Sequence, residues 1–122
     1  MPVKTVLLVD DDPSIRRIGE ITLHEVGKFD VRVAENGLVA LDMIAQEIPD
    51  VILMDVNMPE LDGVETFARI QQDYAYLPVV FMTARSDFEE PPPGAAGLIR
   101  KPFNPITLPV ELRRLAEASS GN

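Results

Sequence analysis

Short apolar runs recur along the chain and predict β-strands. Uninterrupted runs lie at residues 6–9, 51–54, 79–82 and 97–99. Runs of this length that are rich in β-branched residues are typical of strands covered on both faces, as in a parallel sheet. Residues 30–34 instead alternate between polar and apolar side chains, which predicts a strand at the edge of the sheet.

The segments between these runs carry patterns of amphipathic helices. Leu38, Leu41, Ile44 and Ile48 recur at intervals of three, three and four after Asn36-Gly37. Leu108, Leu112 and Leu115 indicate a last helix near the end of the chain. Strands that alternate with helices predict an α/β fold with a doubly wound parallel sheet.

Two helix starts and a proline have recognisable signals. Asp12 followed by Pro13 has the pattern of an N-cap with proline at the first helical position. Asp62 and Glu65 have the spacing of a capping box. Pro109 is tolerated only in the first turn of the last helix. Asp12 and Asp62 are therefore interpreted as caps, not as parts of a catalytic site.

Composition narrows the functional classes. The 122 residues fit one domain, and the formal net charge of -9 disfavours attraction to DNA or anionic lipid. The absence of cysteine excludes disulfides and thiol chemistry. We find no stretch long enough to span a bilayer and no secretory signal pattern, so the sequence predicts a cytoplasmic protein that is either a stand-alone domain or an excised one.

Polar residues follow the predicted strands. Asp10 and Asp11 come directly after the first run, Asp55 after the run at 51–54, Thr83 after the next and Lys101 after the last. In an open doubly wound sheet, ligands bind at the carboxyl ends of the strands where the strand order reverses. If the order is 2-1-3-4-5, the first and third strands are neighbours and their carboxylates converge.

This set of residues has the chemistry of phosphoryl transfer. Clustered carboxylates repel one another unless their pKa values rise or a cation joins them. Magnesium suits such a cluster, because it binds one or two carboxylates and keeps waters for a phosphate ligand. Asp55 is then the predicted nucleophile, with Lys101 beside the phosphoryl oxygens.

Four motifs, taken in order, closely resemble those of the receiver domains of two-component response regulators. They are VLLVDDDPSIRRI, ILMDVNMPELDG, VVFMTAR and LIRKPF, and the resemblance extends from about Val3 to Ala118. Each motif alone is weak, but all four at suitable spacings are strong. The resemblance implies a flavodoxin-like sheet of five strands in the order 2-1-3-4-5. We expect a receiver domain over residues 1–118 and a frayed tail over 119–122.

The resemblance also implies a role for each acidic residue. Asp10 and Asp11 are the acidic pair of a Mg²⁺ (or Mn²⁺) site, and Asp55 is the phosphoacceptor. In that family the second acid and the acceptor hold the metal directly. A backbone carbonyl two residues after the acceptor, here that of Asn57, completes the protein ligands.

Two further roles and the partners follow from the same resemblance. Thr83 resembles the hydroxyl that responds to phosphorylation, and Lys101 the lysine that contacts the phosphoryl group, with a cis bond to Pro102. A sensor histidine kinase or phosphotransfer protein would donate the phosphoryl group, and an unspecified downstream protein would receive the signal. Direct DNA binding is not expected.

The chain departs from the family in two places. Leu98 stands where an aromatic residue often precedes the lysine. Between Thr83 and Lys101, Pro91, Pro92 and Pro93 remove backbone donors and disfavour helical dihedrals. We therefore predict that residues 86–94 form a loop, that the fourth helix of the family is shortened or missing, and that Leu98 and Ile99 are partly uncovered.

Three other functions remain as alternatives. Asp10-x-Asp12 has the spacing of the nucleophile and acid of a haloacid-dehalogenase-like phosphatase. That fold also needs a pair of carboxylates on a further strand after the lysine. A phosphorylation-independent binding module with this fold usually lacks the acceptor or the lysine, and both are present here. A flavin-binding protein would need a Ser/Thr/Gly-rich phosphate loop, which the sequence lacks.

Overall fold

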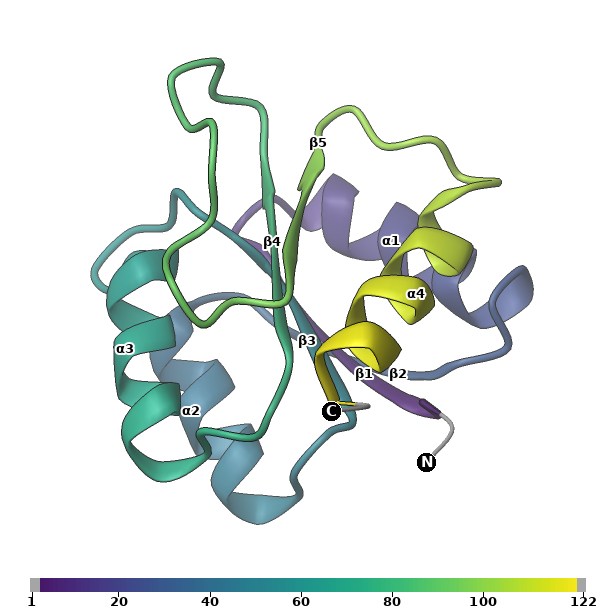
Figure 1. Ribbon diagram of the computed structural model, residues 1–122. Coiled ribbons are helices and arrows are strands. Elements are labelled where there is room, and N and C mark those ends of the chain that lie inside the picture. The colour runs from purple at the N-terminus through teal and green to yellow at the C-terminus, as the bar shows by residue number, and fades with distance from the viewer. Residues whose placement is uncertain (1–2, 121–122) are drawn as a thin grey trace.

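A five-stranded parallel sheet forms the centre of the molecule. The computed structural model describes residues 3–120, and the strands lie in the order β2-β1-β3-β4-β5 (Figure 1). Their bounds are Thr5–Val9 for β1, Asp30–Ala34 for β2, Val51–Asp55 for β3, Val79–Thr83 for β4 and Gly97–Arg100 for β5. The predicted doubly wound sheet and its strand order are confirmed, with β2 at one edge.

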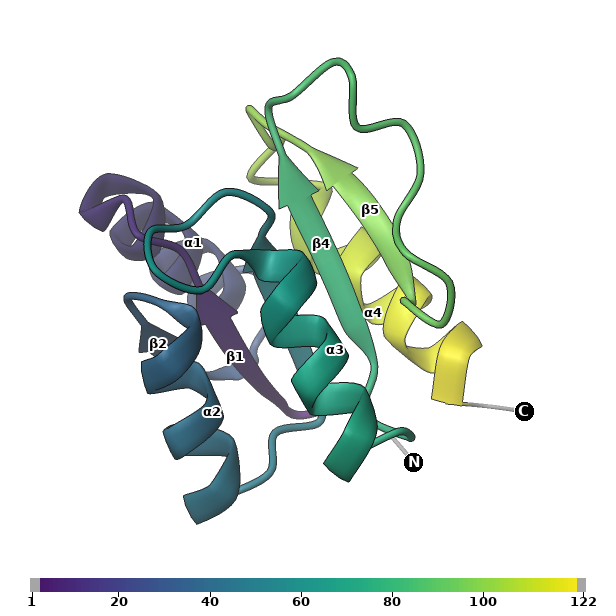
Figure 2. The same ribbon diagram turned by 90° about the vertical axis from the view of Figure 1, so that its left-hand side faces the viewer.

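Four helices cover the two faces of the sheet. They are α1 (Pro13–Glu25), α2 (Gly37–Gln46), α3 (Gly63–Asp73) and α4 (Leu108–Ser120). Figures 1 and 2 show α2 and α3 on one face and α1 and α4 on the other. Each face has its own apolar cluster, which explains the uninterrupted apolar runs of the central strands β1, β3 and β4.

Successive side chains of β1 and β3 point to opposite faces of the sheet and so enter the two apolar clusters in turn. Leu7 pairs in register with Ile52, and both point into the cluster under α2 and α3. Leu8 pairs with Leu53, and both point into the cluster under α1 and α4. All four side chains are fully buried. Since a slip by one residue would exchange the two faces, the packing fixes the register that aligns the strand ends.

The predicted helix starts are confirmed. The Asp12 side chain accepts a hydrogen bond from the Ser14 N–H at 2.8 Å, with Pro13 at the first helical position. Asp62 and Glu65 form the reciprocal bonds of a capping box at the start of α3. Pro109 lies in the first turn of α4, where its missing N–H costs little.

The predicted apolar stripe of α2 is only partly correct. Ile44 is buried, but Leu38 is 47% exposed, and Ile48 lies beyond the helix end and is 45% exposed. The buried face is instead formed by Gly37, Ala40 and Ile44. A helix turns by about 100° per residue, so a stripe that starts at Gly37 rotates Leu38 away from the sheet.

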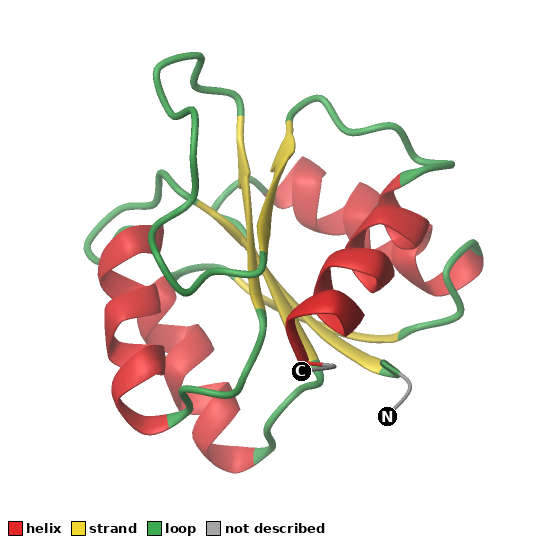
Figure 3. Ribbon diagram, viewed as in Figure 1, coloured by secondary structure: helices red, strands yellow, loops and turns green. Residues whose placement is uncertain are grey.

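The segment between β4 and β5 is a loop, as the three prolines predict. Residues 84–96 contain only turns and bends, and Figure 3 shows this segment as a long loop beyond β4. Leu98 is partly exposed, as expected, but Ile99 is 4% exposed because it packs into the α1 and α4 cluster. The prediction that Ile99 is uncovered is therefore wrong.

The end of the chain and one peptide bond complete the description. The Lys101–Pro102 bond is cis, as the family resemblance implies. Helix α4 continues to Ser120, and residues 121–122 of the predicted tail lie outside the described part of the chain.

Gly63 lies where the start of α3 presses against the end of β3. Its N–H donates to the Val56 carbonyl at 2.8 Å. A Cβ added at Gly63 would lie 2.3 Å from the Asp55 carbonyl oxygen and 2.9 Å from the Val56 Cα. Both obstacles are backbone atoms, so no side chain can move aside.

We expect Gly63→Ala to lower the free energy of unfolding by about 1–3 kcal/mol, the usual cost of overpacking. Urea denaturation of the purified variant measures this change through its midpoint. The exposed α3 residue Arg69 provides the control, because Arg69→Ala should change stability by no more than about 0.5 kcal/mol. Equal stability of both variants would show that the close approach of Gly63 to Asp55 is unimportant.

Candidate functional site

The carboxyl ends of four strands bring the predicted site residues to one edge of the sheet. Asp10 directly follows β1, Asp55 ends β3, Thr83 ends β4 and Lys101 directly follows β5. Asp10, Asp55 and Thr83 are buried, with exposed fractions of 0%, 7% and 0%. The predicted convergence of the first and third strands is confirmed.

Three carboxylates form a cluster at this edge. Asp10, Asp11 and Asp55 each offer one oxygen, and the three oxygens lie within 4.8 Å of one another. Asp10 and Asp55 are buried, whereas Asp11 is exposed. Three carboxylate oxygens at this spacing, open to solvent through Asp11, fit a hard divalent cation that keeps part of its hydration shell.

Lys101 lies between the two buried carboxylates. Its Nζ donates to Asp10 Oδ2 at 2.8 Å and forms an ion pair with Asp55 Oδ2 at 3.3 Å. The Lys101 backbone N–H donates to the Thr83 carbonyl at 2.9 Å, which ties the lysine to β4. Burial disfavours the charged ammonium, but the hydrogen bond to Asp10 and the charge of Asp55 outweigh it and raise the pKa of Lys101. The lysine therefore stays protonated.

The environment of Asp55 disfavours its charge. Burial raises the pKa of Asp55 above its usual value, and the neighbouring charge of Asp10 raises it further. Lys101 and the Asn57 N–H act in the opposite direction without cancelling these effects. The site thus holds a carboxylate whose charge is incompletely compensated, and a cation or the loss of the charge would relieve it.

Backbone donors orient the two buried carboxylates. Asp10 Oδ1 accepts from the Asp12 N–H at 2.9 Å, and Asp55 Oδ1 accepts from the Asn57 N–H at 3.3 Å. With each Oδ1 bound in this way, the Oδ2 atoms of Asp10 and Asp55 face the Lys101 ammonium. The loop after each strand therefore fixes the rotamer of the carboxylate that precedes it.

The structure adds one residue that the sequence did not single out. Arg85 donates from a guanidinium nitrogen to Asn57 Oδ1 at 3.2 Å and forms a two-bond pair with Asp87. Its backbone N–H donates to the Thr83 hydroxyl at 3.0 Å. Arg85 thus joins the loop after β3 to the loop after β4. Its position two residues after Thr83 was the only signal available in the sequence.

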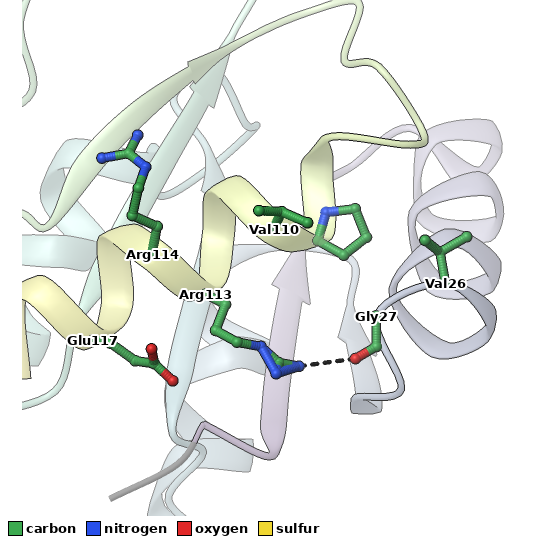
Figure 4. A pocket seen from close by; sticks show the side chains of 7 residues that line it. Val26, Gly27, Val110, Arg113, Arg114 and Glu117 are labelled. Atoms are coloured by element: carbon green, nitrogen blue, oxygen red, sulfur yellow. Dashed lines mark hydrogen bonds between the residues drawn. The ribbon is translucent and has the colours of Figure 1, made fainter.

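The surface has a depression beside this site and a second hollow elsewhere. Residues of the loops after β1 and β3 line an open depression of about 490 Å³: Asp11, Asn57, Met58, Pro59 and Asp62. A larger hollow of about 590 Å³ lies between α1 and α4, where Arg113 donates to the Gly27 carbonyl at 2.8 Å (Figure 4). Its walls include Val26 and Val110 and hold no cluster of carboxylates, so the chemistry belongs to the depression at the strand ends.

Comparison with protein families matches residues 6–113 to the response regulator receiver domain. The transcriptional regulatory protein TrcR of Mycobacterium tuberculosis is 35% identical over 119 residues, which are 94% of this chain and 46% of that protein. The chain spans about half the length, or less, of the curated relatives it matches.

Solved structures give the same fold. The chemotaxis protein CheY4 of Vibrio cholerae is 36% identical, with a TM-score of 0.79 over 93% of this chain and 98% of that one. The response regulator TrrA of Thermotoga maritima, solved in complex with Mg²⁺-BeF, is 29% identical, with a TM-score of 0.82 over 92% of this chain and 98% of that one.

Replacing Asp55 by asparagine should stabilise the protein when no divalent cation is present. The change removes a buried charge next to Asp10 but keeps the shape of the side chain, so we expect a gain of about 0.5–2 kcal/mol at neutral pH. Urea denaturation in a chelating buffer measures it, and Asp11→Asn at the exposed member of the cluster should change stability by no more than about 0.5 kcal/mol.

The gain should depend on pH in a defined direction. The pKa of Asp55 is raised above 3.8 on folding, so the cost of its charge is fully present above the folded-state pKa and disappears below 3.8. The difference between Asp55→Asn and the wild type should therefore shrink as the pH falls. A difference that grows toward acid would contradict this account.

Proposed function

The chain belongs to the response regulator receiver family, and from that premise we propose that Asp55 accepts a phosphoryl group. The donor we propose is the phosphohistidine of a sensor histidine kinase or a phosphotransfer protein. The domain acts as a signalling module, so its chemistry is its own phosphorylation and slow dephosphorylation. Phosphorylation then changes its affinity for a downstream protein.

The observation that carries this proposal is the placement of Asp55. Its carboxylate is buried at 7% exposure, lies 3.3 Å from the Lys101 ammonium and shares a cluster with two further carboxylates. A carboxylate that only stabilised the fold would not need to be buried beside the anionic Asp10, because burial and that charge both raise its pKa. Such an arrangement is typical of a reactive group.

We propose that Asp11 and Asp55 hold Mg²⁺ or Mn²⁺, with Asp10 as the other member of the acidic pair and the Asn57 carbonyl as a further ligand. The three clustered oxygens fit this donor set. The ion, when bound, neutralises charge on the carboxylates and on the incoming phosphoryl group. The TrrA structure, solved with Mg²⁺-BeF, supports this assignment by family likeness.

The transfer is a displacement at phosphorus. An Asp55 oxygen forms the new P–O bond while the P–N bond of the donor phosphohistidine breaks, and the donor imidazole leaves with the electron pair. Lys101 already lies beside Asp55 Oδ2, so its ammonium is near the developing negative charge. The lysine therefore stabilises the phosphoryl oxygens without taking up or releasing a proton.

We propose that Thr83 detects the product. Its hydroxyl is fully buried at the end of β4, next to β3, where Asp55 pairs in register with the preceding residue Met82. The hydroxyl accepts the Arg85 N–H and still has a proton to donate to an oxygen on Asp55. Thr83 thus responds to phosphorylation without being needed for the transfer.

The alternatives from the sequence lose support at this site. In the described chain beyond Lys101, the acidic residues Glu111 and Glu117 both lie on α4, away from any further strand, which disfavours a haloacid-dehalogenase-like phosphatase. A phosphorylation-independent module would not need Asp55 and Lys101 to be in contact. Among residues 3–120, no helix is both long and apolar enough to cross a membrane.

Incubation with acetyl phosphate should label the protein only when a divalent cation is present. The anionic donor cannot approach the acidic cluster unaided, so a chelator should abolish labelling. Asp55→Asn should remove the label, while Asp12→Asn, at the capping residue, should keep it. Intact mass and lability of the label in base measure the outcome, and stoichiometric labelling of Asp55→Asn would refute the assignment.

Lys101→Ala should leave the affinity for Mg²⁺ equal to that of the wild type or higher. The ammonium lies 2.8 and 3.3 Å from two carboxylates of the cluster, so it competes with a cation for them. The same variant should be phosphorylated more slowly.

Titration of both proteins with Mg²⁺, followed by calorimetry, measures the affinity. A loss of affinity of more than about tenfold, equal to 1.4 kcal/mol, would show that Lys101 holds the metal site together.

A further inference from the structure

A ring of hydrogen bonds closes around Asp11, the exposed member of the acidic cluster. We infer that Arg16, near the start of α1, is a positioning residue for the cation site, because it closes this ring and so directs the Asp11 carboxylate toward Asp55. The inference rests on the proposed function, in which Asp11 and Asp55 hold the divalent cation. It adds a residue that lies outside the acidic cluster and acts on it through the backbone.

Three hydrogen bonds form the ring. The Asp12 N–H donates to Asp10 Oδ1 at 2.9 Å, and the Arg16 N–H donates to the Asp12 carbonyl at 3.0 Å. The Arg16 guanidinium then donates to the Asp10 carbonyl at 2.8 Å and so returns to the residue at which the ring begins. The backbone on both sides of Asp11 is therefore fixed by hydrogen bonds.

Asp10 gives this ring a rigid base. It is fully buried, its N–H donates to the Ala34 carbonyl at 3.1 Å, and its Oδ2 accepts from Lys101 Nζ at 2.8 Å. The ring itself occupies its Oδ1 and its carbonyl. A carbonyl at a buried residue is unfavourable without a donor, and the Arg16 guanidinium supplies one from the helix that follows.

The Asp11 side chain, by contrast, is exposed. In the part of the chain that the structure describes, no hydrogen bond holds its carboxylate, yet one of its oxygens lies within 4.8 Å of oxygens of Asp10 and Asp55. The direction of such a side chain follows from its backbone. The Asp10 carbonyl belongs to the planar peptide that leads into Asp11, so the bond from Arg16 fixes the plane from which the Asp11 side chain departs.

Close packing of α1 on the sheet brings Arg16 to this carbonyl. Ile15 packs against the apolar cluster beneath α1, and a Cβ added at the buried Gly19 would lie 2.6 Å from Leu8 Cδ2. The helix therefore contacts the sheet on both sides of Arg16. Long side chains of a helix point back toward its N-terminus, which for Arg16 is the end of β1. Arg16 is accordingly half-buried, whereas the neighbouring Arg17 is exposed.

The sign of the effect on cation binding separates positioning from the other roles that Arg16 could have. The charge of a guanidinium beside Asp10 repels a divalent cation, so a purely electrostatic role predicts that removal of Arg16 raises the affinity. A role only in stabilising α1 predicts lower stability and unchanged affinity. Positioning predicts a lower affinity, because without Arg16 the peptide before Asp11 is free to turn and the carboxylate leaves the direction of Asp55.

Arg16→Met tests the inference, because methionine keeps an unbranched stem and a high helix propensity but has no donor. We expect Mg²⁺ to bind about tenfold more weakly, the lower end of the range for residues that orient metal ligands. Arg17→Met is the matched control and should bind within about twofold of the wild type, since exposed charges are screened by salt. Calorimetry measures the affinity, and the rise of the urea midpoint with Mg²⁺ concentration measures it independently.

Two further measurements report on positioning and not on stability. The difference in affinity between Arg16→Met and the wild type should persist at high ionic strength, because salt screens charges and leaves the direction of the Asp11 side chain unchanged. With acetyl phosphate as donor, the Mg²⁺ concentration for half-maximal labelling should rise about tenfold, while the rate at saturating Mg²⁺ stays near that of the wild type. Arg16→Ala, which also removes the stem, is a second variant that should behave in the same way.

The outcomes distinguish this inference from the proposed function. An affinity of Arg16→Met and Arg16→Ala for Mg²⁺ that equals or exceeds that of the wild type would overturn the positioning role and leave Asp11 and Asp55 as the cation ligands. No binding of Mg²⁺ to the wild type would overturn the proposed cation site and, with it, the role of Arg16. Weaker binding by both Arg16 variants, but not by Arg17→Met, would support both.

Discussion

The Lys101 ammonium between Asp10 and Asp55 is the interaction on which the site depends. It brings the end of β5 to the ends of β1 and β3, and its backbone bond to Thr83 joins β4 to the same group. Two buried carboxylates without this cation would be strongly destabilising. Because the lysine compensates only part of the charge, the pKa of Asp55 stays raised, and the cluster remains able to accept a second cation.

The buried acidic cluster lowers the stability of the fold and keeps Asp55 in a reactive environment. The apolar clusters on both faces of the sheet are tightly packed and set the strand register, so the rigid part of the molecule lies directly beneath the acids. Gly63 allows α3 to begin against the Asp55 carbonyl, which holds the end of β3 in place. The packing below thus holds the backbone of Asp55, the proposed phosphoacceptor, while the Asn57 N–H and the Lys101 ammonium orient its carboxylate.

Most of the fold and the positions of the site residues could be predicted from the sequence, because they follow from local patterns and one topological rule. Apolar runs gave the strands, and the edge at which parallel strands end brought Asp10, Asp55 and Lys101 together. The contact of Arg85 with Asn57 could not be predicted, since it joins residues 28 positions apart through an exposed and flexible side chain. The orientation of α2 was misjudged for a different reason: Leu38 is apolar, but the helix phase is set by packing at Gly37, where a Cβ would meet Thr66 and Leu61 of the neighbouring α3 region.

The three prolines between β4 and β5 remove a helix from the fold but leave the acidic site unchanged. Pro91 to Pro93 lack the N–H groups that a helix requires, so the face of β4 near Phe81 needs another cover. Phe88 provides one aromatic ring where a helix would provide several side chains. A cover with so few contacts opens at low cost, and low local stability is what a segment that moves on signalling requires. The loss of the helix is therefore compatible with signalling.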